Sequence, residues 1–348
     1  MNDKIRRGSL LAAAASTYAG CVDIDNYLTI VALEDGLTAS LSVNDVEYCI
    51  DGNDNWTTLT ADTASPAINK GQTLSFRGNL IPASYKGVGT FKISKSCDLT
   101  GNCMSLLFGD NAKTNLSLSG KDYAFYYLFY NCTTIINVSS NFLPATTLAT
   151  YCYNSMFQGC ASLTTVPKLP ATTLASYCYQ YMFYNCKALT TAPQLPATTL
   201  ADYCYQSMFY GCSSLTTTPS ILPATTLASY CYYSMFSGCS SLTTTPQLPA
   251  TKLVNYCYNS MFSGCSSLTI APELPAKTLV SNCYYYMFYR CSKLNYIKAM
   301  FTTTPSSSYT GSWVSGVASS GTFVKNKNAT WNVTGTSGIP SGWTVQTA

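Results

Sequence analysis

The stretch YCYNSMFQGC, residues 151–160, decides the fold because the chain repeats it. Related copies follow at 177–186, 203–212, 230–239, 256–265 and 282–291. The motif Leu-Pro-Ala precedes each copy and begins at 143, 169, 195, 222, 248 and 274, so the period is 26 residues with one interval of 27. Near-identical units at such a period are typical of a solenoid, in which each unit covers the apolar side of its neighbour.

The apolar residues within a unit predict one helix and one short strand. Leu148, Cys152 and Met156 lie four residues apart, a spacing that places side chains on one face of a helix. Gly159 follows, and its tolerance of positive φ is typical of a helix end. The threonine-rich segment after it has the β-branched residues of a strand.

Short apolar or alternating runs precede the repeats and predict a small β-sandwich over residues 22–100. These runs are 27–33, 37–43, 46–51, 73–79 and 89–95. After the repeats, residues 300–348 are rich in Ser, Thr and Gly and predict a β-rich C-terminal cap. We therefore expect an α+β fold with a solenoid over residues 101–299 between these two flanks. Three tryptophans of the cap are expected to cover the open last repeat: Trp313, Trp331 and Trp343.

The first 21 residues have two interpretations. A basic start, a short Leu/Ala stretch and the sequence Ala-Gly-Cys are typical of a bacterial lipoprotein signal, in which Cys21 would be lipidated after cleavage. Tyr18 stands where such signals prefer an aliphatic residue. The alternative is an intact N-terminal arm that docks onto a larger assembly.

A family resemblance rests on the repeated motif itself. Met156-Phe157, Cys160, Leu163 and the Val-Pro that follows are similar to the unit AF-x-x-C-x-x-L-x-x-I-x-I-P of the BspA-like, or Treponema-type, leucine-rich repeats. The resemblance covers about residues 121–299 and implies an extracellular binding or adhesion role, in proteins of the kind found in Bacteroides-type bacteria and their phages. The period of 26 and the extra cysteine in each unit depart from that pattern.

Seventeen cysteines and no histidine raise the question of disulfides or a metal. The two cysteines of one unit would lie about 12 Å apart along a helix, beyond the roughly 7 Å that a disulfide can bridge. Zinc needs four converging ligands, and neither histidine nor a CxxC pair supplies them. We therefore expect buried, reduced thiols and no metal site. Outside the repeats, Cys97 and Cys103 are the best candidates for a disulfide.

The composition argues against several function classes. Only 10% of residues are charged and the net charge is +4, too little to neutralise many phosphates, so nucleic acid is not an expected partner. No run of about 18 apolar residues occurs, so no transmembrane segment is expected. Nucleophilic catalysis by cysteine usually needs a histidine as its base, and the chain has none. The repeats contain just two acidic residues, Asp202 and Glu273, so paired acids for hydrolysis are scarce. The sequence predicts no enzyme and no cofactor.

Candidate binding residues form columns by register. Tyrosines placed on the outside of the expected helices form the first column: Tyr153, Tyr179, Tyr205, Tyr232, Tyr258 and Tyr284. Threonines expected on a concave strand face form the second: Thr165, Thr191, Thr217 and Thr244. A variable position supplies Lys168, Gln194, Gln247 and Glu273. Further tyrosines occur at Tyr181, Tyr184, Tyr210, Tyr233, Tyr285, Tyr286 and Tyr289. The alternative for the first column is that its rings pack between repeats.

Two functions follow from these features. The first is a surface-exposed adhesion or recognition protein that binds a glycan or protein of a bacterium or host. The second is a structural virion component, a phage fibre or decoration protein anchored by its N-terminus, whose partners are other virion proteins. Location at a cell surface or in a virion, and a homo-oligomeric state, remain open alternatives.

Overall fold

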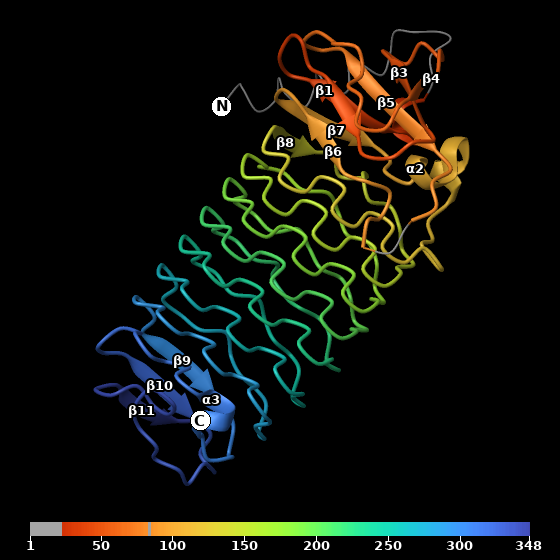
Figure 1. Cartoon of the computed structure of the whole chain (residues 1–348). Helices are drawn as coiled ribbons and strands as arrows, with labels where there is room; N and C mark the ends of the chain where they lie inside the picture. The colour runs from red at the N-terminus through yellow and green to blue at the C-terminus, as the bar shows by residue number, and fades with distance from the viewer. Residues whose placement is uncertain (1–22, 83–84) are drawn as a thin grey trace.

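A computed structural model describes residues 23–82 and 85–348. Figure 1 shows an N-terminal sheet, a stack of coils and a C-terminal sheet that follow one another along a single line. The arm or signal expected at residues 1–21, with Cys21, lies outside the described residues. In the part of the chain that is described, no helix is long and apolar enough to cross a membrane.

A six-stranded sheet forms the N-terminal part, with strand order β4-β3-β5-β1-β7-β8. Its strands are β1 (Leu28–Ala32), β3 (Val46–Ile50), β4 (Thr57–Leu59), β5 (Thr73–Gly78), β7 (Cys97–Gly101) and β8 (Ile135–Val138). A separate antiparallel pair contains β2 (Ala39–Leu41) and β6 (Phe91–Ile93). Each of the five predicted runs contains a strand, whereas β4 and β7 were not predicted. Short helices accompany the sheet: η1 (Ile24–Asn26), α2 (Ser105–Phe108) and η2 (Gly109–Thr114).

The repeats contain no helices, so the prediction of one helix per repeat is wrong. From residue 115 to residue 295 no residue is α-helical, and residues 151–159 form consecutive turns. We name the segment 149–160, and its equivalents in the other coils, the turn ribbon. Positive φ recurs in it every four residues, at Tyr151 (57°), Ser155 (55°) and Gly159 (78°). A type II turn requires positive φ at its third residue, so every second turn of the ribbon has this form.

Backbone hydrogen bonds of the turn ribbon alternate between two directions. The amide of Cys152 closes a turn on Ala149 at 3.3 Å, whereas the next amide, of Tyr153, donates to Cys178 in the following coil at 3.0 Å. The same alternation continues through the ribbon and from coil to coil. Each backbone amide is therefore satisfied without a helix, and adjacent coils are joined by the backbone itself.

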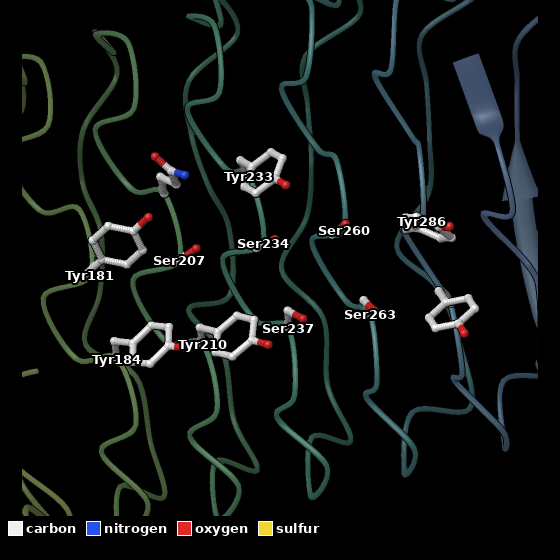
Figure 2. A pocket seen from close by; sticks show the side chains of 12 residues that line it. Tyr181, Tyr184, Ser207, Tyr210, Tyr233, Ser234, Ser237, Ser260, Ser263 and Tyr286 are labelled. Carbon is white, nitrogen blue, oxygen red and sulfur yellow. The ribbon is translucent and has the colours of Figure 1, made fainter. Parts of the chain in front are cut away.

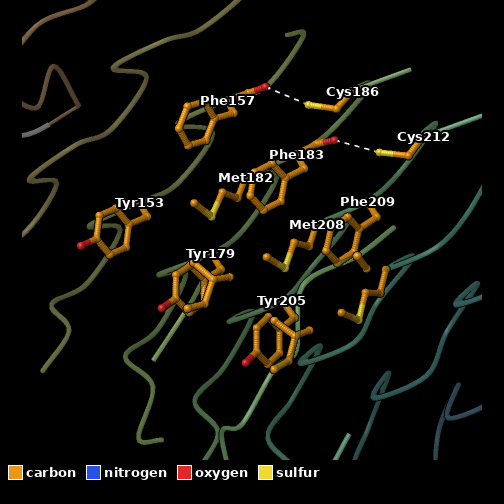
Figure 3. Close-up of a cluster of buried hydrophobic side chains, with 14 of the residues drawn as sticks. Tyr153, Phe157, Tyr179, Met182, Phe183, Cys186, Tyr205, Met208, Phe209 and Cys212 are labelled. Atoms are coloured by element: carbon orange, nitrogen blue, oxygen red, sulfur yellow. Dashed lines mark hydrogen bonds between the residues drawn. The ribbon is translucent and has the colours of Figure 1, made fainter. Parts of the chain in front are cut away.

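The interior consists of identical side chains stacked in columns (Figure 3). Phe157 and Phe183 stack with ring centroids 5.7 Å apart and planes 6° apart, and Tyr153 stacks on Tyr179 at 5.8 Å. The cysteine, methionine and leucine columns beside these rings are fully buried. These contacts belong to one hydrophobic core that runs from the N-terminal sheet to the C-terminal residues.

Short strands and isolated bridges hold the opposite edge of the stack. β7 pairs in parallel with β8, and single parallel bridges such as Thr191 with Thr217 continue this edge between coils. At the far end, β9 (Tyr296–Ala299), β10 (Thr322–Lys325) and β11 (Thr344–Thr347) form a parallel sheet, with α3 (Ser307–Thr310) beside them. Trp313 lies against Tyr284 and Phe288 of the last repeat, with ring centroids 6.3 and 6.0 Å apart.

Candidate functional site

The first predicted binding column is not at the surface. Its six tyrosines are at most 2% exposed: Tyr153, Tyr179, Tyr205, Tyr232, Tyr258 and Tyr284. The placement outside a helix was wrong because the turn ribbon buries neighbouring residues in pairs, here Cys152 with Tyr153 and Met156 with Phe157. These rings stack on one another inside the coils, so the alternative interpretation as packing residues describes them.

Every described cysteine is a buried free thiol, including Cys97 and Cys103, so the candidate disulfide between these two is not formed. The second cysteine of each repeat donates from its thiol to a phenylalanine carbonyl in the preceding coil, as Cys186 does to Phe157. Burial raises the pKa of Cys212 to about 12, which keeps this thiol protonated at neutral pH. Within the described residues, no group of three or more Asp, Glu, Cys or His side chains is placed to hold a metal ion.

The other two predicted columns are exposed along one edge of the coils. This threonine edge contains Thr165, Thr191, Thr217 and Thr244, together with Lys168, Gln194, Gln247 and Glu273. Thr191 and Thr217 face each other across a parallel bridge, and Glu273 forms an ion pair with Lys298 at 3.1 Å. The structure brings these residues onto one surface, and a binding role for them stays a prediction.

A different surface shows more variation between the repeats. Position 155 is occupied in successive coils by Ser155, Tyr181, Ser207, Ser234, Ser260 and Tyr286. Position 158 is occupied by Gln158, Tyr184, Tyr210, Ser237, Ser263 and Tyr289. The residues at 153, 156, 157 and 160 are the same in all six copies. Positions 155 and 158 are buried or half-buried in every copy except Tyr210, yet they vary while the core positions do not, which indicates that core packing does not fix their residues.

These variable positions enclose a hollow of about 640 Å³, which we name the Tyr–Ser hollow (Figure 2). Its lining is Tyr181, Tyr184, Gln206, Ser207, Tyr210, Tyr233, Ser234, Ser237, Ser260, Ser263, Tyr286 and Tyr289. Small serines of the middle coils leave the space, Tyr233 stands along its side, and tyrosines of the flanking coils stand at both ends. The hollow therefore arises from repeat-to-repeat differences in side-chain size.

The lining contains unused hydrogen-bonding groups. Ser207, Ser234 and Ser237 are 5%, 6% and 8% exposed, and their hydroxyls form no hydrogen bond with any residue of 23–82 or 85–348. A row of hydrogen-bonded side-chain amides also ends at the hollow. The Gln180 amide oxygen accepts from the Asn154 amide nitrogen at 2.7 Å, and the Gln180 amide nitrogen donates to the Gln206 amide oxygen. The Gln206 amide nitrogen has no further partner among the described residues, since the next coil has a tyrosine at this position. A ligand in the hollow would meet these donors and acceptors.

A second tyrosine column, which was not among the predicted binding residues, lies half-buried at the start of the turn ribbon. Its members are Tyr123, Tyr151, Tyr177, Tyr203, Tyr230 and Tyr256. Neighbouring rings stack 4.4 to 4.7 Å apart with planes within 9° of parallel. This column shields the ribbon edge and does not line the hollow.

Comparison with known proteins identifies the repeats. Residues 122–269 and 206–315 match the family described as BspA type Leucine rich repeat region (6 copies). A solved leucine-rich repeat protein from Bacteroides ovatus ATCC 8483 is similar over 64% of this chain, with 14% sequence identity and a TM-score of 0.26. The chain spans 63% of that protein. No curated protein matches the sequence.

Proposed function

Because the chain belongs to the BspA-type leucine-rich repeat family, we propose that it is a non-enzymatic recognition protein that faces outward from a cell or virion. Proteins of this family generally act in adhesion-like recognition. The proposed ligand is a glycan or protein on the surface of a bacterium or host, bound by the outer surface of the repeat array.

The observation that carries this proposal is the contrast between the two sides of each coil. The core positions 153, 156, 157 and 160 are identical in six copies, whereas positions 154, 155 and 158, which are buried or half-buried except at Tyr210, change from coil to coil. Packing alone would allow the same small polar residue in every copy. The change from serine to tyrosine instead produces one hollow with unused hydroxyl and amide groups, which suits the binding of a partner.

Adhesion of the full chain to cells tests the proposal. We expect the purified, fluorescently labelled protein to bind a bacterial or host cell surface, and Ser234→Tyr to weaken that binding because it fills the hollow. Thr191→Ala tests the threonine edge, the other candidate surface, in the same cell-binding assay. A folded protein that binds no cell surface would contradict the proposal and favour the purely architectural role in a virion.

The anchoring of the protein is a separate part of the proposal. A lipid on Cys21 would place the protein on a cell surface, whereas an uncleaved start at Met1 would suit a virion or assembly subunit. The intact mass of the protein isolated from its native source distinguishes these settings, because a diacylglycerol group and the loss of 20 residues change the mass in opposite directions by different amounts.

A further inference from the structure

We propose that the Tyr–Ser hollow binds a neutral oligosaccharide, an inference that rests on the recognition function proposed above. The hollow combines three properties that a chain of neutral sugars matches: a lining without charge, a set of unpaired hydroxyl and amide groups, and aromatic rings at both ends.

The lining favours a ligand without charge. All twelve lining residues are Tyr, Ser or Gln, so none is charged at neutral pH. The cation beside the hollow, Arg290, lies over the Tyr289 ring at 5.0 Å and is not part of the lining. An acidic peptide, a phosphate or a sialylated glycan would lose hydration in the hollow without gaining an ion pair from its walls.

The polar groups of the lining suit the hydroxyls of a sugar. Ser207, Ser234 and Ser237 each offer a hydroxyl that both donates and accepts, and Gln206 offers an amide donor. These serines are more than nine-tenths buried, yet their hydroxyls have no partner among the described residues. A ligand that supplies a donor and an acceptor at each unit satisfies such groups, whereas an apolar peptide side chain would leave them unsatisfied.

The tyrosines at the ends supply flat apolar surfaces. Tyr184 and Tyr210 stack with ring centroids 4.8 Å apart and planes 2° apart at one end. Tyr286 and Tyr289 meet edge to face at 5.0 Å at the other end. The C–H face of a sugar ring packs against such rings, while the sugar hydroxyls remain free for hydrogen bonds.

The length of the hollow favours several sugar rings over one. Tyr181 and Tyr286 occupy the same position in coils that are four steps apart. Coils joined by backbone hydrogen bonds lie about 4.8 Å apart, so this distance is ~19 Å. An extended oligosaccharide can contact both tyrosine ends and the serines between them, whereas a monosaccharide reaches one end at most.

The chain itself offers matched substitutions for the test. Ser234→Tyr and Ser237→Tyr place in the middle of the hollow a residue that other coils already carry at the same positions, with the same positive φ in the case of position 234. Tyr210→Ser makes the reverse change at one end. Each substitution introduces a residue that another repeat carries at the same position, so we expect folding to be retained, which circular dichroism and the thermal unfolding midpoint check.

The full chain and these variants are applied to immobilised neutral polysaccharides (β-glucan, mannan, xylan and starch) and to hyaluronan and sialyllactose as acidic controls. We expect the wild-type chain to bind at least one neutral polymer, Ser234→Tyr to abolish this binding, and Tyr210→Ser to weaken it roughly fivefold, since one stacking contact contributes about 1 kcal/mol. Lys252→Ala, at an exposed position outside both the hollow and the threonine edge, should bind as the wild type does.

The possible failures are distinguishable. Adhesion to cells without binding to any neutral polymer would overturn the oligosaccharide while leaving the recognition function intact. Binding to a neutral polymer that Ser234→Tyr leaves unchanged would overturn the hollow as the site. Preference for the acidic polymers would overturn the neutral character of the ligand.

Discussion

The Cys186 thiol donates a hydrogen bond to the carbonyl oxygen of Phe157 in the preceding coil, at 3.2 Å (Figure 3). That same oxygen accepts the amide of Cys160 at 3.1 Å, so it joins two coils. Equivalent thiol bonds of 3.0 to 3.2 Å recur along the stack at Cys132, Cys160, Cys212, Cys239, Cys265 and Cys291. The repeated cysteine is therefore a small polar link between coils, which accounts for this column without a metal or a disulfide.

Removing a cysteine whose thiol donates this hydrogen bond should destabilise the protein more than removing a buried cysteine whose thiol donates none. Cys212 donates to Phe183 at 3.1 Å, whereas Cys204 is equally buried and its thiol donates no such bond. We expect Cys212→Ala to lower the free energy of unfolding by about 2 kcal/mol, and by about 0.5–1 kcal/mol more than Cys204→Ala, because only the first leaves a buried carbonyl without its second donor. Urea unfolding in the presence of a reductant measures both values, and equal losses would contradict the role of the bond.

The buried thiols should make stability fall at alkaline pH. Desolvation raises the pKa values of Cys204 and Cys212 to about 12 from an ordinary value of 9.0. The pKa of each thiol is higher in the folded protein than in the unfolded chain, so the stabilisation that these protonated thiols contribute is complete below about pH 9. It is lost as the pH rises toward 12, because the unfolded chain releases its thiol protons first. We expect the urea midpoint to decrease between pH 9 and pH 11, with a shallower slope in Cys212→Ala. A midpoint that stays constant over this range would contradict the buried, protonated state.

The period of 26 and the family could be predicted from the sequence, but the local structure of the ribbon could not. Leu148, Cys152 and Met156 are four residues apart, which fits one helix face and fits equally a ribbon that repeats every four residues. A helix turns about 100° per residue, so a strict period of four drifts by ~40° at each step. The apolar pairs Cys152-Tyr153 and Met156-Phe157 show no such drift, and this lack of drift was the available signal.

The candidate site was hidden by the same error. With a helix assumed, position 153 was placed on the outside, although it is buried together with position 152. The serines of the hollow carry no signal individually, since serine is common on any surface. A comparison of the six copies position by position, at 155 and 158, distinguishes the variable outer surface from the constant interior without a structure.

An unpaired buried hydroxyl predicts a stabilising substitution. Tyr179 is 1% exposed, and its hydroxyl has no hydrogen-bond partner among the described residues. Tyr179→Phe keeps the stacked ring and removes the unsatisfied group, so we expect the free energy of unfolding to rise by about 1 kcal/mol. Tyr179→Ala, which also removes the ring, should lower it by about 3–5 kcal/mol. Thermal and urea unfolding measure both variants, and a less stable Tyr179→Phe would mean that the hydroxyl has a partner.

Positive φ at the end of the ribbon predicts opposite effects at two equivalent positions. Gly238 has φ of 76°, a conformation that costs a residue with a Cβ, so Gly238→Ala should lower the free energy of unfolding by about 1–2 kcal/mol even though the added Cβ would meet the Gly211 Cα at an ordinary 3.4 Å. Arg290 occupies the same position in the last coil with φ of 59°. Arg290→Gly relieves its backbone strain, and we expect it to be about 1 kcal/mol more stable than Arg290→Ala.

Arg290→Ala is the matched control for this pair because it also removes the guanidinium, which lies over the Tyr289 ring at 5.0 Å. The difference between the glycine and alanine variants therefore reports the backbone conformation and not the lost ring contact. Urea unfolding of the three proteins measures it. Equal stability of the two variants would mean that the last coil relaxes to negative φ, and the uniform four-residue turn period would then end before Arg290.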